Sequence, residues 1–216
     1  MRLYLSSFGV GDHSARLLAL FERAEGAEVA VVVNAIDERP AAVRALGVEQ
    51  ESDAMRALGL RPTEVDLRAY FDRPAAEVAA VLGRFAAVWV RGGNVFLLRH
   101  ALARSGADTV LVDLLRRDAI VYAGYSAGAC VLAPSLRGLE RCDDADVVTA
   151  LYGDPVCWDG LAVLDHAVVP HFDTPGHPES EVLGRVVAEY RASGVPHRTL
   201  RDDQVLVHDG DRVEVH

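Results

Sequence analysis

The residues best suited to chemistry in this sequence surround a serine. Gly124, Ser126 and Gly128 form a G-x-S-x-G pattern, which follows an apolar run typical of a strand and precedes small residues typical of a helix. In that context a sharp turn points the serine hydroxyl out of the sheet, and the helix N-terminus offers N–H groups to a developing oxyanion. The alternative is a glycine-rich turn with an inert serine, and the flanking strand and helix favour a nucleophile.

A nucleophilic serine needs a base, and His171 is the best placed of the eight histidines. It closes an apolar strand at its carboxyl end, the sheet edge where Ser126 is also expected. His166 begins the same strand and is expected at the opposite edge. His177 lies nearby on a loop and is the second choice.

A third group is needed to orient the histidine, and an acidic cluster lies between Ser126 and His171 in the chain. It contains Asp143, Asp144 and Asp146. For at least two of these three acids the correct interpretation must be a solvated loop. The separation of 45 residues between serine and histidine is short for an ordinary α/β-hydrolase, which favours a different α/β scaffold with the same constellation.

A second glycine-rich turn, Arg91–Asn94, follows another apolar strand and precedes a helical segment. We expect the Gly93 N–H to join the Ala127 N–H as the two oxyanion donors, since glycine permits close backbone approach. A plain strand–helix turn is the alternative interpretation.

Metal and cofactor sites are not expected. His171, Asp173 and His177 have a metal-like spacing, but only one carboxylate accompanies the histidines. The cysteines at positions 130, 142 and 157 form no C-x-x-C pair, so neither a zinc knuckle nor a disulfide framework is indicated. All 22 basic residues are arginines, which excludes a lysine Schiff base and a Walker-type phosphate loop.

Composition sets the class of protein. The 216 residues are half hydrophobic and 25% charged, which is globular and enough for one α/β domain. The net charge of −10 argues against nucleic acid as a partner, because such a binder needs a basic face. No apolar run reaches membrane-spanning length and the N-terminus lacks a signal sequence, so we expect no membrane partner and a cytoplasmic location.

Strand-like and helix-like segments alternate along the chain, which predicts a mostly parallel sheet with helices on both faces. The expected strands are 3–5, 29–33, 64–67, 87–90, 119–123 and 163–170, with a terminal hairpin over 204–208 and 212–215. The expected helices are 14–25, 40–58, 74–83, 95–104, 109–117, a short one up to 133, and 179–193.

Several of these segments together resemble the dipeptidase E (aspartyl dipeptidase) family of serine peptidases, whose relatives include the cyanophycinases. The matching pieces are Val88–Leu98, Val121–Ala129, Ala133–Arg137, and Trp158–Leu161 leading to Pro170–Phe172. The resemblance covers roughly residues 1–190, and it implies a class I glutamine-amidotransferase-like three-layer α/β sandwich. We therefore expect residues 1–216 to form a single serine-peptidase domain.

The resemblance also implies roles for particular residues. Ser126 is the nucleophile, His171 is the base, and the family's acid falls at Asp143 or Asp144, with Asp143 favoured. Gly93 and Ala127 form the oxyanion hole. Arg185, with Asn94, is expected to bind substrate, because an arginine after the catalytic histidine recognises the substrate's aspartate side chain in the family.

The implied activity is metal-free hydrolysis of dipeptides with N-terminal aspartate, so the expected partner is a small peptide. Two alternatives stay open at this point. One is a different substrate, either a cyanophycinase-like β-Asp-Arg hydrolase or an esterase. The other is a non-catalytic amidotransferase-like binding module. The sequence also leaves open whether two copies pair in a homodimer.

Overall fold

A seven-stranded sheet forms the centre of the molecule. The computed structural model describes residues 1–216. Its strands are β1 (Arg2–Ser6), β2 (Glu28–Val32), β3 (Arg61–Glu64), β4 (Ala87–Val90), β5 (Val121–Tyr125), β6 (Ala167–Val169), β7 (His197–Thr199), β8 (Val205–Asp209) and β9 (Arg212–Val215). The central sheet has the order β3-β2-β4-β5-β1-β8-β9, and only β8 and β9 are antiparallel to their neighbours.

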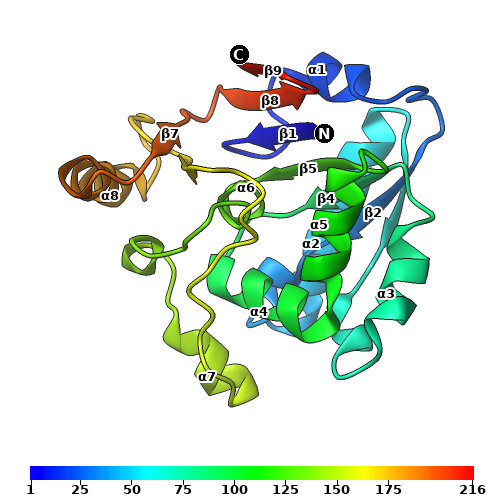
Figure 1. The fold of residues 1–216 in the computed structure, drawn as a ribbon, viewed down its shortest axis with the longest axis horizontal. Coiled ribbons are helices and arrows are strands. Elements are labelled where there is room, and N and C mark those ends of the chain that lie inside the picture. The colour runs from blue at the N-terminus through cyan, green and yellow to red at the C-terminus, as the bar shows by residue number, and fades with distance from the viewer.

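Helices cover both faces of this sheet (Figure 1). They are α1 (Ser14–Ala19), α2 (Ala41–Ala57), α3 (Ala75–Leu82), α4 (Val95–Ser105), α5 (Ala107–Arg116), α6 (Ala127–Cys130), α7 (Asp146–Tyr152) and α8 (Ser180–Ser193). One face packs against α1 and α2, and the other packs against α3 to α6. The predicted α/β sandwich with a mostly parallel sheet is therefore confirmed.

Strand composition explains the layers. Strand β4 is buried along its whole length, as expected for a central parallel strand with a helix layer on either side. Successive side chains alternate between the two faces. Val88 and Val90 belong to the larger core of 37 residues, whereas Trp89 belongs to the second core of 16.

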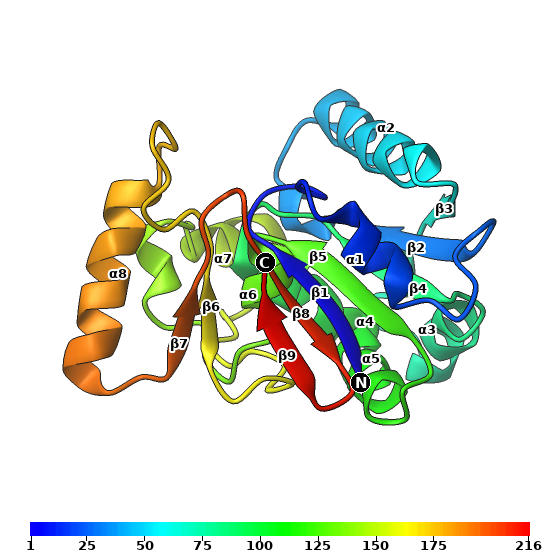
Figure 2. The ribbon, with the colours of Figure 1, turned by 90° about the horizontal axis from the view of Figure 1, so that it is seen from above.

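A smaller unit lies beside the main sheet. Strands β6 and β7 pair in parallel as a separate two-stranded sheet, and α8 covers them through Leu183, Val186 and Val187. Figure 2 shows this unit at the opposite end of the molecule from α2. The strand predicted over 163–170 is thus only three residues long, and β7 was not predicted.

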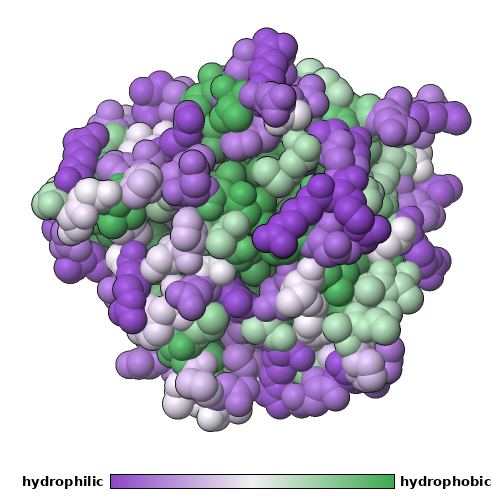
Figure 3. Space-filling view, viewed as in Figure 1, coloured by the Kyte–Doolittle hydropathy of each residue, from purple (hydrophilic) through white to green (hydrophobic).

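The remaining differences are local. The strand expected over 64–67 lies at 61–64, and a 3₁₀ turn occupies Leu67–Tyr70. Helix α7 was not predicted. None of the helices is long and apolar enough to cross a membrane. On the face shown in Figure 3, hydrophobic residues lie in several patches between hydrophilic ones.

Candidate active site

Ser126 lies on a strained turn between β5 and α6. Its backbone angles, φ 50° and ψ −117°, are unfavourable for a residue with a side chain. Glycines on both sides make the turn feasible. A Cβ atom at Gly124 would lie 2.8 Å from the Val90 carbonyl oxygen, and one at Gly128 would lie 2.3 Å from it. The G-x-S-x-G pattern therefore lets strand and helix pack closely around the half-buried Ser126.

His171 connects Ser126 to a carboxylate. Its Nε2 lies 3.2 Å from the Ser126 Oγ, and its Nδ1 lies 2.5 Å from Oδ1 of Asp202. An ionised carboxylate can only accept a hydrogen bond, so it favours the tautomer in which Nδ1 carries the hydrogen. In that tautomer Nε2 is free to accept the serine proton. The predicted contact between Ser126 and His171 is present, 45 residues apart in the chain.

The small unit brings Asp202 to His171. Parallel pairing of β6 with β7 aligns Val169 with Thr199, so the segments after both strands run side by side. The Phe172 N–H then donates to the Leu200 carbonyl at 3.0 Å. Asp202 lies in the loop between β7 and β8, next to the carboxyl end of β6, which His171 follows.

Ser7, which directly follows β1, joins this arrangement to the main sheet. Its buried hydroxyl donates to Asp202 Oδ1 at 2.8 Å and accepts the His171 backbone N–H at 2.8 Å. His171 also has a positive φ of 55°. One hydroxyl thus fixes both the strained backbone of the histidine and the carboxylate that contacts its ring.

The prediction that Asp143 or Asp144 contacts His171 is wrong. The Asp143 carboxylate accepts the Val95 N–H at 2.8 Å, at the start of α4. The Asp144 carboxylate accepts the Asp146 N–H at 3.0 Å, at the start of α7. Both side chains are engaged at helix N-termini, where a carboxylate is stabilised by unpaired N–H groups.

Two features hid Asp202 in the sequence. The order serine, acid, histidine points to the segment between Ser126 and His171, whereas Asp202 comes after both in the chain. The strand that positions it, β7, is three residues long and includes His197 and Arg198, so it lacks an apolar signature. The available signal was the pair Asp202 and Asp203 immediately before the β8 hairpin.

The second glycine turn lies against Ser126. A Cβ atom at Gly92 would approach the Ser126 Cβ to 2.9 Å. Gly93 has φ 142°, and a Cβ there would lie 2.5 Å from the Ala35 carbonyl oxygen, so only glycine fits. The Gly93 N–H has no acceptor within the chain. Ala127 is the first residue of α6, where an N–H has no intrahelical acceptor.

Ser126 and His171 open into a cavity of about 730 Å³, which Gly93, Asn94, Asp143 and Asp144 also line. Asn94 is also the N-cap residue of α4, because its Oδ1 accepts hydrogen bonds from the Phe96 and Leu97 N–H groups.

Arg185, which the resemblance implies as a substrate-binding residue, does not line the cavity that contains Ser126. This side chain is 60% exposed on α8 and pairs with Glu181 one turn earlier.

Burial dominates the electrostatics of the site. It lowers the pKa of His171 below its usual value, the Asp202 carboxylate opposes this, and the neighbouring His177 adds to the lowering. A neutral imidazole at neutral pH is what a base requires. Burial also raises the pKa of Asp143 to about 7, against the Val95 hydrogen bond and with help from Glu179 and Glu38.

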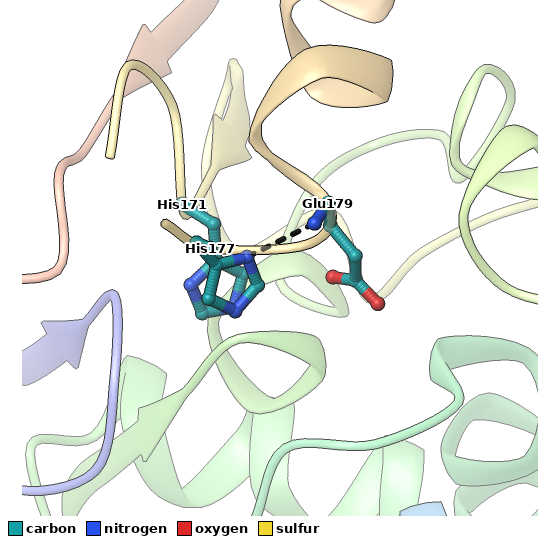
Figure 4. A group of neighbouring side chains, drawn as sticks. All are labelled: His171, His177 and Glu179. Carbon is teal, nitrogen blue, oxygen red and sulfur yellow. Dashed lines mark hydrogen bonds between the residues drawn. The ribbon is translucent and has the colours of Figure 1, made fainter. Parts of the chain in front are cut away.

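His177 stacks on His171, with ring centroids 3.8 Å apart and planes 6° apart (Figure 4). Its Nδ1 accepts the Glu179 N–H at 3.2 Å. His171, His177 and Glu179 offer ligand atoms within 4.8 Å of one another. However, a metal ion binds in the plane of an imidazole ring, and two parallel, stacked planes cannot share one ion. One ring would have to rotate first, so the arrangement favours stacking over coordination.

The fold and the grouping of serine, histidine and carboxylate are typical of α/β hydrolytic enzymes. The model of peptidase family S51 matches residues 17–216, and the chain belongs to that family. The resemblance to dipeptidase E is therefore confirmed.

Individual relatives agree with this assignment. An uncharacterized peptidase of Listeria innocua is 28% identical over 132 residues, 61% of this chain and 60% of that protein. Peptidase E of Streptomyces coelicolor is 33% identical over 133 residues, 58% of this chain and 50% of that protein. The matches thus span 50 to 60% of the length of these curated relatives.

Two solved structures share the fold. A Listeria monocytogenes protein provisionally assigned as peptidase E superposes with a TM-score of 0.81 at 23% identity, covering all of this chain and 97% of that one. A peptidase from an acI-B1 actinobacterium gives 0.70 at 16% identity, covering all of this chain and 86% of that one.

Proposed function

We propose that this chain is a serine-type peptidase in which Ser126 is the nucleophile, His171 the general base and Asp202 the orienting acid. The observation that carries the proposal is the continuous hydrogen-bonded chain from the Ser126 hydroxyl through His171 to Asp202, at the wall of a cavity. The membership in a peptidase family supports the same activity. We further propose that residues 1–216 act as a single peptidase domain.

The reaction would proceed through an acyl-enzyme. Nε2 of His171 takes the Ser126 proton while Oγ bonds to the peptide carbonyl carbon, and the negative oxygen faces the N–H groups of Gly93 and Ala127. The imidazolium then gives its proton to the amine as the C–N bond breaks. A water molecule, deprotonated by His171, attacks the acyl carbon and releases the acid and Ser126.

The proposed substrates are short peptides, above all dipeptides with N-terminal aspartate, as in the dipeptidase E family. A cavity of about 730 Å³ suits a small substrate with charges at several points. Within the lining, Glu179 offers a carboxylate and Asp143 a carboxyl group to the free ammonium of a peptide. Arg39 and Arg91 are the cations available to a substrate carboxylate.

A β-Asp-Arg substrate is the second candidate, and the charge of the cavity favours it. Two guanidinium groups line the cavity together with five acidic side chains. The acids are Glu38, Glu51, Asp143, Asp144 and Glu179. An acidic excess suits a substrate that brings a guanidinium of its own.

Turnover by the Ser126→Ala variant tests the proposal. We expect loss of at least about 10³-fold in kcat on any substrate that the wild type cleaves, because the covalent path is removed. Ser135→Ala, at an exposed serine outside the cavity, is the matched control and should keep wild-type rates. A panel of α-Asp, β-Asp-Arg and ester substrates separates the candidates. Undiminished peptide cleavage by Ser126→Ala would refute the serine mechanism.

A further inference from the structure

An exposed phenylalanine at the active-site cavity has no role in the proposed reaction. The Phe8 side chain is 59% exposed and lines the cavity that contains Ser126 and His171. Of the seven large hydrophobic residues that are this open to solvent, the other six lie outside the cavity lining. Because single exposed hydrophobic residues are common on protein surfaces, it is the location of Phe8, and not its exposure, that calls for an explanation.

The backbone that leads to Phe8 is attached to the nucleophile and to the base. Ser7 directly precedes Phe8, and its hydroxyl accepts the His171 backbone N–H at 2.8 Å. One residue earlier, the Ser6 carbonyl accepts the Ser126 N–H at 3.3 Å. The turn that carries Phe8 therefore starts from a fixed position beside both catalytic side chains.

Contacts between rings hold the Phe8 side chain next to the base. Its ring centroid lies 6.1 Å from that of His171, 6.4 Å from that of His177 and 6.3 Å from that of Tyr125. All three pairs are edge-to-face, an arrangement in which aromatic rings attract each other. Since His177 is stacked on His171, Phe8 contacts both members of this pair (Figure 4). The ring is thus held in place while much of its surface stays open.

The proposed reaction brings one part of the substrate to this place. Nε2 of His171 gives its proton to the amine nitrogen of the breaking C–N bond, which requires an approach to about 3 Å. The residue that departs with this nitrogen, the leaving residue, has its Cα atom bonded to it. Its side chain therefore begins close to the His171 ring, where Phe8 offers open apolar surface.

We infer that Phe8 binds the side chain of the leaving residue and makes the enzyme prefer substrates in which this residue is apolar, such as leucine. The inference rests on the proposed function and adds to it a specificity for the residue after the scissile bond. An apolar side chain that covers Phe8 removes both surfaces from water, which is favourable in proportion to the apolar area buried. A polar side chain of the same size would lose hydration against the ring without gaining a hydrogen bond.

The test compares Asp-Leu with Asp-Gly as substrates. Both dipeptides form the same aspartyl-enzyme, so a difference between their kcat/KM values arises before the leaving residue departs. We expect the wild type to prefer Asp-Leu by about tenfold or more, and Phe8→Ser to lower this preference by about tenfold, the size typical of an apolar contact in a substrate pocket. Phe8→Leu keeps an apolar side chain and should keep the preference within about threefold.

A third dipeptide and a matched variant serve as controls. Asp-Asn has a leaving side chain of similar size to leucine but polar, and the wild type should cleave it no better than about threefold faster than Asp-Gly. Leu46→Ser removes an apolar side chain that is 63% exposed on α2, outside the cavity, and should leave the preference for Asp-Leu unchanged. Labelling of Ser126 by a fluorophosphonate should be retained in Phe8→Ser.

Three results would overturn the inference. One is an unchanged preference for Asp-Leu in Phe8→Ser. The second is an equal fall in kcat/KM for Asp-Leu and Asp-Gly in that variant, with or without labelling of Ser126, since such a fall would mean that Phe8 only supports the catalytic residues. The third is cleavage of Asp-Asn as fast as Asp-Leu by the wild type, which would exclude an apolar contact.

The wild type separates this inference from the proposed function. Equal kcat/KM for Asp-Leu and Asp-Gly, in cleavage that requires Ser126, would overturn the role of Phe8 and leave the serine mechanism standing. Cleavage that persists in Ser126→Ala would refute the mechanism instead. If the substrate panel selects an acyl residue other than aspartate, the same dipeptides are made with that residue, and the test of Phe8 is unaffected.

Discussion

At Ser126 and His171, backbone strain is part of the site. Both residues have positive φ, near 50° and 55°, a conformation that costs of order 1–3 kcal/mol for residues with side chains. Packing around Gly124 and Gly128 maintains the backbone conformation of Ser126. The Ser7 hydroxyl, which accepts the His171 N–H, supports the backbone conformation of His171. The two side chains are therefore aimed at each other before a substrate arrives.

Ionisation of the buried Asp143 lowers the free energy of unfolding, which leads to a stability prediction. Its pKa is raised to about 7, so between about pH 4 and pH 7 the folded protein keeps a proton that the unfolded chain has released. Stability contributed by this group is present below that window and is lost as pH rises through it. Asp143→Asn cannot lose a proton, so its free energy of unfolding should exceed that of the wild type by up to about 4 kcal/mol at pH 8.

Urea unfolding at pH 4, 6 and 8 measures this difference. The difference in the free energy of unfolding should be near zero at pH 4 and grow with pH. Asp144→Asn, at an exposed neighbouring residue, is the matched control. A difference for Asp143→Asn that stays constant over this range would contradict the raised pKa.

At the scale of elements, the close contact between α6 and β4 positions Ser126. A Cβ atom at Gly128 would lie 2.3 Å from the Val90 carbonyl oxygen, a backbone atom that cannot rotate away. Gly128→Ala should therefore lower the free energy of unfolding by more than about 3 kcal/mol, despite the better helix propensity of alanine.

Gly184→Ala is the matched control for that prediction. Gly184 lies inside α8 with open space around its Cα, so alanine should stabilise the protein by about 0.5–1 kcal/mol. Urea unfolding of both variants at one pH checks the pair. Equal effects of the two substitutions would show that helix propensity, and not the contact with Val90, determines the change in the free energy of unfolding.

An element is predictable from the sequence when contiguous residues specify it, and not when it depends on packing against distant segments. The pattern of the turn at Ser126 lies within the contiguous residues from Val121 to Cys130, so the sequence indicates it directly. Most of the helices and the mostly parallel character of the sheet follow from hydrophobic periodicity and the alternation of elements, whereas the order of the strands was not predicted. By contrast, β7 forms only because β6 and α8 pack beside it, and the position of Asp202 depends on that pairing. Likewise, the spacing of Arg185 on its helix does not reveal which side faces solvent.

Across the whole molecule, the site joins two structural units. Ser7 and Ser126 directly follow β1 and β5 of the main sheet, whereas His171 and Asp202 lie in the loops after β6 and β7. Figures 1 and 2 show β6 and β7 beside that sheet. Ser7 contacts both of the latter residues, and the Cys130 thiol donates to the Val168 carbonyl across the same boundary at 3.3 Å. Assembly of the site therefore requires the small unit to be docked on the sheet.

The most direct test of the account is kcat/KM for peptide cleavage by Asp202→Asn compared with its neighbour Asp203→Asn. Asp202 contacts His171, whereas Asp203 is 63% exposed and pairs with Arg201. We predict a loss of about 10³- to 10⁴-fold for Asp202→Asn, because an amide no longer fixes the histidine tautomer, and a change below about threefold for Asp203→Asn. Near wild-type activity in Asp202→Asn, with loss of activity in Asp143→Asn or Asp144→Asn instead, would contradict the account.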